Sequence, residues 1–138
     1  MIIADTGFWL ALLDRRDHFH AIARQYLTQL SEPLMTTTPV VTETCYLLQQ
    51  RVGTSQSIEF LLAQQDGLFS LFDIRPPHIA RCAKLMHQYQ TLPMDFADAS
   101  LVILAEELGH GRIVSTDRRD FGVYRWKNQY PFTNLLEF

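Results

Sequence analysis

The sequence has few cysteines, no long hydrophobic run and no signal peptide. Its 138 residues include two cysteines, Cys45 and Cys82, which lie in apolar helical patterns without the spacing of zinc ligands. We therefore expect two buried free thiols and no disulfide framework, as is typical of cytoplasmic proteins. Asp5 interrupts the apolar N-terminal run, and no stretch approaches the ~20 apolar residues that span a bilayer. No membrane contact is expected.

The sequence also lacks an excess of positive charge and several familiar catalytic motifs. Its net charge of −3 argues against binding nucleic acid through overall charge, although a local basic patch can still bind phosphate. It contains neither a Gly-x-Ser-x-Gly nucleophile elbow nor a Gly-rich phosphate loop. The hydrophobic fraction of 47% and the charged fraction of 20% are those of a globular protein. The length fits one domain over residues 1–138.

Short apolar runs alternate with longer helical patterns along the chain. The runs that we predict to be strands are residues 1–5, 34–38, 68–74 and 112–115. They lack period-2 alternation, which is typical of parallel strands covered on both faces. The spacing of apolar residues predicts helices over residues 8–13, 18–30, 39–52, 54–65, 79–89 and 93–108. Asp17 is expected to cap the second of these helices, and a last strand is expected near 133–136. The pattern predicts an α/β fold with a mostly parallel central sheet of four or five strands flanked by helices.

Four of the fifteen acidic residues fall at ends of these elements that share one edge of such a sheet. Asp5 ends the first strand, and Glu43 lies near the start of the helix after the second. Asp98 lies in the first turn of a helix, and Asp117 follows the fourth strand. Ligands bind at this edge, where the strand order reverses. Crowded carboxylates need a neutralising cation, and Mg²⁺ or Mn²⁺ prefers oxygen ligands. The pattern predicts a divalent-metal site.

Each acid also has a structural explanation that must be weighed. Asp98 suits a helix start because of the helix dipole, and Asp117 suits a turn. Glu43 is harder to explain in this way, because it lies in an apolar helix start where a buried charge needs a partner. Asp5 is harder still, since a carboxylate at the end of a buried strand is rare without a role. The metal-site interpretation therefore depends most on Asp5 and Glu43.

Four segments resemble the motifs of the PIN-domain family, and in particular its VapC-type toxins, in the family's order. The segments are IIADTGF at residues 2–8, PVVTE at 39–43, MDFADASLV at 94–102 and IVSTDRRDF at 113–121. The resemblance implies a three-layer PIN fold and RNA cleavage that depends on Mg²⁺ or Mn²⁺. The residues that the resemblance assigns to the catalytic metal site are Asp5, Glu43, Asp98 and Asp117.

Other residues of these motifs are candidates for supporting roles. Asp95 and Asp120 each lie three residues, about one helical turn, from a chosen acid and could join or replace it. Thr6 and Thr116 are expected to orient neighbouring groups or water. Gly7 stands where many relatives have serine, which removes one hydroxyl but leaves the acids unaffected.

A basic segment with interleaved aromatic residues follows the fourth motif. We predict that it binds RNA phosphates and stacks a base, and the residues concerned are Arg118, Arg119, Arg125 and Lys127, with Tyr124 and Trp126 between them. The structural alternative is a solvated surface with Trp126 in the core. The resemblance further implies a homodimer and a cognate antitoxin that binds near the first helices.

Three other functions compete with the nuclease. An aspartyl-phosphate phosphatase needs a second Asp where Gly7 stands, and a receiver domain needs a phosphoacceptor for which Asp73 is poorly placed. The third is a PIN-like RNA-binding or protein-interaction module without catalysis, because a fold alone does not fix a function. Metal-dependent RNA cleavage distinguishes the nuclease from this module.

Overall fold

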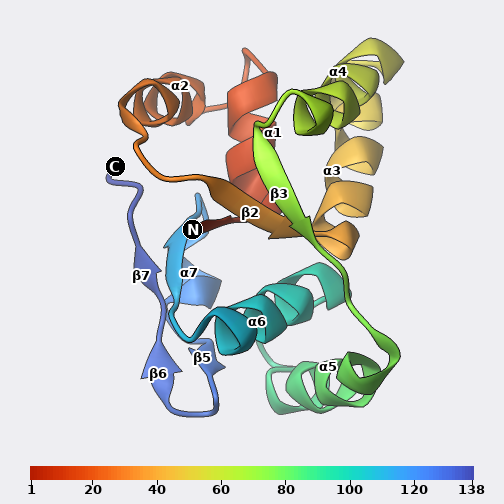
Figure 1. Cartoon of the computed structure of the whole chain (residues 1–138), viewed down its shortest axis with the longest axis vertical. Coiled ribbons are helices and arrows are strands. Elements are labelled where there is room, and N and C mark those ends of the chain that lie inside the picture. The colour runs from red at the N-terminus through yellow and green to blue at the C-terminus, as the bar shows by residue number, and fades with distance from the viewer.

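A computed structural model describes residues 1–138 as an α/β fold with one five-stranded sheet between helices (Figure 1). The strands of this sheet are β1 (Ile2–Ala4), β2 (Leu34–Thr37), β3 (Phe69–Phe72), β4 (Arg112–Val114) and β7 (Thr133–Asn134). Their order is β3-β2-β1-β4-β7, and every neighbouring pair is parallel. The expected fold class is thereby confirmed.

Helices cover both faces of the sheet. They are α1 (Thr6–Leu13), α2 (His20–Gln29), α3 (Thr38–Arg51), α4 (Thr54–Gln65), α5 (Pro76–Gln88), α6 (Phe96–Leu108) and the short α7 (Arg118–Phe121). In Figure 1, α1, α2 and α4 lie above the sheet, and α5 and α6 lie below it. The helix α6 contacts β1 and β2 as well as α3. No helix combines the length and the apolar character needed to cross a membrane.

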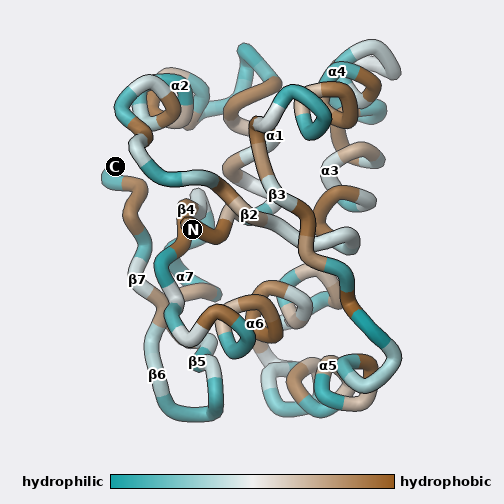
Figure 2. Tube along the Cα trace, in the orientation of Figure 1, coloured by the Kyte–Doolittle hydropathy of each residue, from teal (hydrophilic) through white to brown (hydrophobic).

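The core lies where β1 passes between α1 and α6. All three residues of β1 are buried, and so are most residues of α6, which explains why both read as apolar in the sequence. Trp9 of α1 packs against the rings of Phe60 and Phe69 on one face of the sheet. Figure 2 shows hydrophobic residues following the strands and the inner sides of the helices. The strand ends therefore rest on a buried hydrophobic core.

The strand order reverses at β1. From β1 the chain goes to β2 on one side, whereas β4 returns to pair with β1 on the other. Because β1 and β4 are parallel, Asp5 and Ser115 leave the sheet side by side, at the edge where doubly wound proteins bind ligands. The helices α1 and α7 begin directly after these two strands, so their first turns lie at the same edge.

Several local predictions were wrong or incomplete. The helix predicted over residues 93–108 begins only at Phe96, because Asp95 caps it, and the helix predicted over 79–89 begins earlier, at Pro76. Asp17 does not cap α2; its carboxylate accepts a hydrogen bond from Phe19 N at 2.8 Å, and the helix begins at His20. The first helix starts two residues earlier than predicted, because Asp5 caps it. The helix α7 and the hairpin of β5 (Arg125–Trp126) and β6 (Tyr130–Pro131) were not predicted. These elements are too short to show a hydrophobic period.

Candidate active site

Asp5 is held rigidly at the end of β1. Its carboxylate caps α1 by accepting a hydrogen bond from Phe8 N at 2.9 Å, and it accepts a second from the Ser115 hydroxyl. Only 5% of the residue is exposed. Burial raises the pKa of Asp5 to about 6 in spite of these hydrogen bonds, and the charge of Asp117 adds to the rise. The two hydrogen bonds therefore orient the carboxylate, but they do not fully offset the cost of burying its charge.

Glu43 points into the same region from the second turn of α3. The helix α3 begins at Thr38 because Thr37 caps it and Pro39 stands in its first turn. The pKa of Glu43 is raised to about 7, mainly by burial and then by the side chain of Asp95, while the side chain of Thr6 opposes the rise. Thr6 thus acts on a site carboxylate, in keeping with its expected supporting role.

Asp95 and Asp98 open α6 with reciprocal capping bonds. The Asp95 carboxylate accepts from Asp98 N at 2.8 Å, and the Asp98 carboxylate accepts from Asp95 N at 3.4 Å. Capping therefore explains part of their presence. It does not explain the pKa of Asp98, which burial raises to about 8, with further contributions from the charges of Asp95, Asp5 and Glu43.

Asp117 caps α7 and lies beside Asp120. Its carboxylate accepts a hydrogen bond from Asp120 N at 2.9 Å. The pKa of Asp117 is raised, first by burial and then by the Asp120 side chain. Asp120 itself pairs with Arg119 at 3.1 Å, so it already has a cationic partner. This difference favours Asp117 over Asp120 as a metal ligand.

The four chosen acids act on one another electrostatically. The charge of Asp117 acts on Asp5, and the charge of Asp5 acts on both Glu43 and Asp98. None of the four forms an ion pair with Lys, Arg or His. Segments more than a hundred residues apart therefore bring uncompensated negative charge to one edge of the sheet.

The donor atoms suit a hard divalent cation, but they do not form a ready-made cage. No group of three or more His, Cys, Asp or Glu side chains is arranged so that it could hold an ion. Mg²⁺ does not require such a cage, because it commonly uses one or two carboxylates together with water and substrate phosphate. Burial first, and neighbouring acids after it, raise the pKa values of Asp5, Glu43 and Asp98, and a cation bound beside them would favour their charged forms.

Two residues at the site were missed from the sequence. Ser115 is fully buried; it donates to Asp5 and accepts a hydrogen bond from Asp117 N at 2.9 Å. Tyr124 is also fully buried, and its hydroxyl lies 3.3 Å from Asp98 Oδ2. Ser115 could have been suspected from its place within the fourth motif, two residues before Asp117. No local sequence pattern links Tyr124 to Asp98, and the sequence suggests base stacking as the role of Tyr124 instead.

Most of the basic segment is engaged within the protein. Arg118 donates to the Phe138 carbonyl and lies 3.9 Å from the centre of that ring. Arg125 donates to three backbone carbonyls. Trp126 stacks on Tyr130 and packs against the core, which agrees with the structural alternative for this side chain. The role of this segment in RNA binding stays a prediction.

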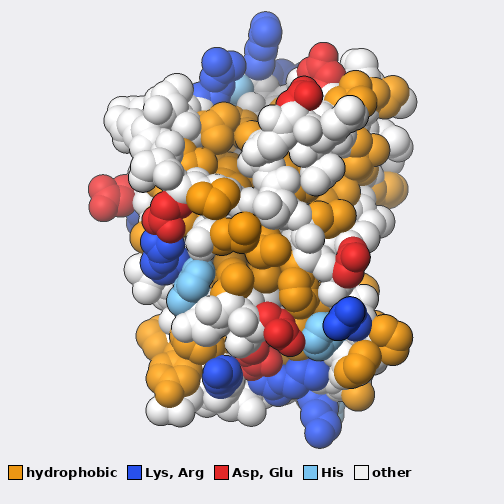
Figure 3. All heavy atoms as spheres, in the orientation of Figure 1, with side chains coloured by type: hydrophobic (Ala, Val, Ile, Leu, Met, Phe, Trp, Pro, Cys, Tyr) orange, Lys and Arg blue, Asp and Glu red, His pale blue; other side chains and the backbone are white.

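Basic side chains do not dominate the visible surface. On the face shown in Figure 3, Lys and Arg stand mainly at the top and bottom and do not join into one stripe. This agrees with the net charge of −3. Neither this face nor the net charge offers an extended basic surface for RNA.

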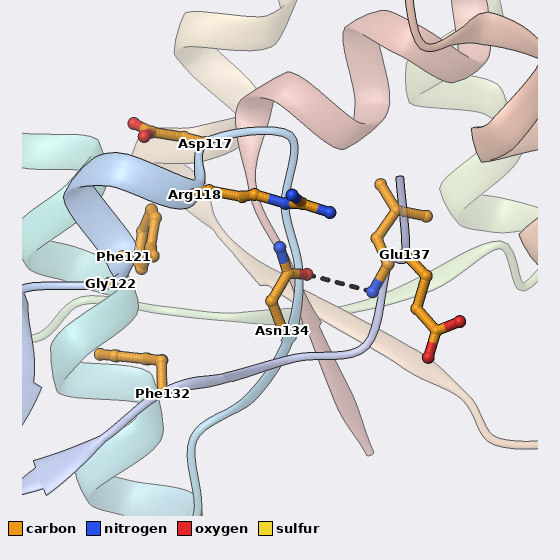
Figure 4. A pocket seen from close by; sticks show the side chains of 8 residues that line it. Asp117, Arg118, Phe121, Gly122, Phe132, Asn134 and Glu137 are labelled. Atoms are coloured by element: carbon orange, nitrogen blue, oxygen red, sulfur yellow. Dashed lines mark hydrogen bonds between the residues drawn. The ribbon is translucent and has the colours of Figure 1, made fainter.

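Two cavities adjoin the acidic residues. The larger, of about 1020 Å³, lies between α3, the start of α5 and the start of α6, and Glu43 and Asp95 line it together with exposed Tyr46 and Phe96. The smaller, of about 290 Å³, is lined by Asp117, Arg118 and Asn134 among others (Figure 4). The larger cavity has room for more than a single small ligand.

The parallel sheet and its acidic edge define a doubly wound α/β protein with a carboxylate site at the strand-order switch. Residues 2–127 match the PIN domain, and the chain belongs to the PIN-domain family. It is 29% identical over 124 residues to Ribonuclease VapC26 of Mycobacterium tuberculosis, a match that covers 90% of this chain and 92% of that protein.

A solved structure confirms the fold. The chain is similar to the crystal structure of Mycobacterium tuberculosis VapC20, a toxin that cleaves the sarcin–ricin loop, with a TM-score of 0.80. The match covers 86% of this chain and 92% of VapC20 at 19% sequence identity. At that identity the likeness establishes a shared fold and leaves the substrate open.

Proposed function

We propose that this protein is a metal-dependent endoribonuclease that hydrolyses phosphodiester bonds with Mg²⁺ or Mn²⁺ held by Asp5, Glu43, Asp98 and Asp117. The observation that carries the proposal is the buried Asp5 at the β1–β4 switch point, which acts electrostatically on Glu43 and Asp98 and is acted on by Asp117, while none of the four forms an ion pair. The PIN-domain match and the related ribonuclease VapC26 support the same activity. Asp95 and Asp120 are alternates to their neighbours.

The protein's contribution to the chemistry is to orient oxygen ligands and the substrate. A bound divalent ion would lower the pKa of a water molecule and offset the charge that develops on the phosphate. Asp5 is fixed in advance by Phe8 N and Ser115, so little ordering is needed when the site fills. Asp117 is fixed in the same way by the first turn of α7.

The larger cavity is the proposed path of the RNA next to the acids. Tyr46 is 60% exposed and Phe96 is 40% exposed, and both line it, as does the guanidinium-bearing Arg75. Exposed aromatic rings stack bases of single-stranded RNA without regard to sequence. Arg118, Arg119, Arg125 and Lys127 would bind phosphates on the side of Asp117. A second copy of the chain is the competing occupant of this cavity.

The biological setting is proposed from the resemblance to VapC-type toxins. We propose that the protein is the toxin of a toxin–antitoxin pair in the cytoplasm, that it forms a homodimer, and that a cognate antitoxin inhibits it. The competing function is a PIN-like module that binds RNA or protein without cleaving.

The decisive experiment compares RNA cleavage in Mn²⁺ and in EDTA. Structured and unstructured RNAs are incubated with wild-type protein, Asp5→Asn and Glu43→Gln, and Asp66→Asn serves as an exposed control far from the site. We expect cleavage only by the wild type and the control, and only with metal. Cleavage that persists in EDTA or in Asp5→Asn contradicts the mechanism, whereas RNA binding without cleavage supports the binding module.

A further inference from the structure

The edge strand β7 uses a side chain to continue its pairing with β4. Backbone bonds join the two strands from Thr133 N to Gly111 O at 2.8 Å and from Leu135 N to Ile113 O at 2.7 Å. The next backbone groups on the β4 side are the N–H and C=O of Ser115, which lies just beyond the end of β4. The side-chain amide of Asn134 pairs with both: Ser115 N donates to Asn134 Oδ1 at 3.1 Å, and Asn134 Nδ2 donates to Ser115 O at 2.9 Å.

The Asn134 amide is itself fixed. Its Oδ1 also accepts a hydrogen bond from Leu136 N at 3.1 Å, drawn as the dashed line in Figure 4. Three hydrogen bonds therefore define where this side chain lies, and two of them define the peptide groups of Ser115. Ser115 is fully buried while Asn134 is in place, so the amide, and not water, satisfies these two backbone groups.

Ser115, held by Asn134, in turn forms hydrogen bonds with two of the acidic residues. Its hydroxyl has one hydrogen, which it donates to the Asp5 carboxylate, and its oxygen accepts from Asp117 N at 2.9 Å. A single hydroxyl thus contacts the acid that follows β1 and the backbone of the acid that follows β4. Movement of the Ser115 backbone would release both.

We infer that Asn134 is a positioning residue of the acidic site, which acts by holding Ser115 so that its hydroxyl orients Asp5 and Asp117. The inference rests on the proposed metal site. It assigns a part in that site to the segment beyond residue 127, where the match to the PIN domain stops. The alternative is that Asn134 only docks the tail against the sheet.

Leu136 provides a matched control for tail docking. Leu136 is 3% exposed and packs in the core. Its apolar side chain has no donor or acceptor with which to hold Ser115 or the acids. Leu136→Ala should therefore loosen the tail while the Asn134 amide keeps its partners. Asn134→Ala removes the amide and keeps the apolar anchor.

The test measures amide hydrogen exchange by NMR and Mn²⁺ binding by calorimetry in the wild type and both variants. Asn134→Ala should speed exchange at Ser115 and Asp117 and weaken Mn²⁺ binding by no more than the about 10- to 100-fold that is usual when a residue bonded directly to a metal ligand, here Ser115, is lost. Leu136→Ala should lower the melting temperature with little change in either measurement. Asn134→Leu, which keeps a similar size without adding charge and loses the amide, serves if Asn134→Ala does not fold.

A double variant tests whether the effect passes through Ser115. In a Ser115→Ala background no hydroxyl remains to be misplaced, so adding Asn134→Ala should not weaken Mn²⁺ binding further. Additive losses, or an Asn134 variant that behaves like Leu136→Ala, overturn the inference while the proposed function stands. If the wild type binds no Mn²⁺, the proposed function fails, and unchanged exchange at Ser115 and Asp117 in Asn134→Ala would overturn the ordering role of Asn134 as well.

Discussion

Gly7 and Thr116 approach so closely that a Cβ atom on residue 7 would lie 2.2 Å from the Thr116 hydroxyl oxygen. The same Cβ would lie 3.6 Å from Asp5 Oδ1. The space left by Gly7 is therefore filled by a hydroxyl that comes from the β4 side. The Thr116 hydroxyl thus occupies the space that a serine side chain at position 7 would need.

We predict that Gly7→Ala impairs activity more than stability. Thr116 can rotate away from the new methyl group, and alanine in place of glycine favours α1 by about 0.5–1 kcal/mol, so the melting temperature should change little. The hydroxyl, however, must leave its place beside Asp5, and the cleavage rate should fall as far as in Thr116→Ala. Cleavage assays and thermal melts measure the two effects. Full activity in Gly7→Ala would show that this hydroxyl has no role.

The stability of the metal-free protein should fall as pH rises. The folded-state pKa values of Asp5, Glu43 and Asp98 are raised to about 6, 7 and 8, above their ordinary values of 3.8, 4.5 and 3.8. Between those limits the folded state holds more protons than the unfolded state, so stability decreases with increasing pH. In EDTA the melting temperature should therefore decline from about pH 4 to pH 8.

Asp98→Asn provides the control for this pH dependence. Asparagine at position 98 can still accept the hydrogen bond from Asp95 N but carries no charge. At pH 8 in EDTA this variant should melt at a higher temperature than the wild type, and its decline with pH should be shallower. Asp66→Asn, on the exposed end of α4, should follow the wild type. A wild-type melting temperature that rises over this range would contradict the assignment.

Divalent metal should stabilise the folded protein through the same carboxylates. A ligand at 100 times its Kd that binds only the folded state adds about 2.7 kcal/mol, which for a domain of this size is roughly 5–10 °C in melting temperature. We expect such a shift with Mn²⁺ at pH 7 in the wild type and its absence in Asp5→Asn. Equal shifts in both proteins would place the ion elsewhere.

The basic segment yields a prediction about salt dependence. Replacing Arg118 and Arg119 with alanine should weaken RNA binding and reduce the slope of log K against log salt by about 1.4, since each single-strand phosphate contact contributes about 0.7. Fluorescence anisotropy over a salt series, in an Asp5→Asn background that prevents cleavage, measures this. An unchanged slope would mean that these arginines serve only the contacts with Phe138 and Asp120.

The sequence was sufficient for the parts of the fold that depend on periodic burial. The strands and long helices follow from apolar runs and spacing, and the acids follow from their place at element ends. What could not be predicted are side-chain contacts between distant segments. Ser115 and Asp5 are 110 residues apart in sequence, and Tyr124 reaches Asp98 only because the chain after α7 folds back over α6.

The larger cavity yields a prediction that separates RNA binding from self-association. Tyr46→Ala should weaken binding of single-stranded RNA about 5- to 150-fold, the loss expected for about 1–3 kcal/mol of stacking on one base. Ile58→Ala is the control, because Ile58 is also a large exposed hydrophobic residue, 51% exposed on α4, but does not line the cavity. Anisotropy in the Asp5→Asn background gives the affinities, and analytical ultracentrifugation gives the oligomeric state. If Tyr46→Ala dissociates a dimer and leaves RNA affinity unchanged, the cavity is an interface between copies, and the RNA must approach the acids from the side of Asp117.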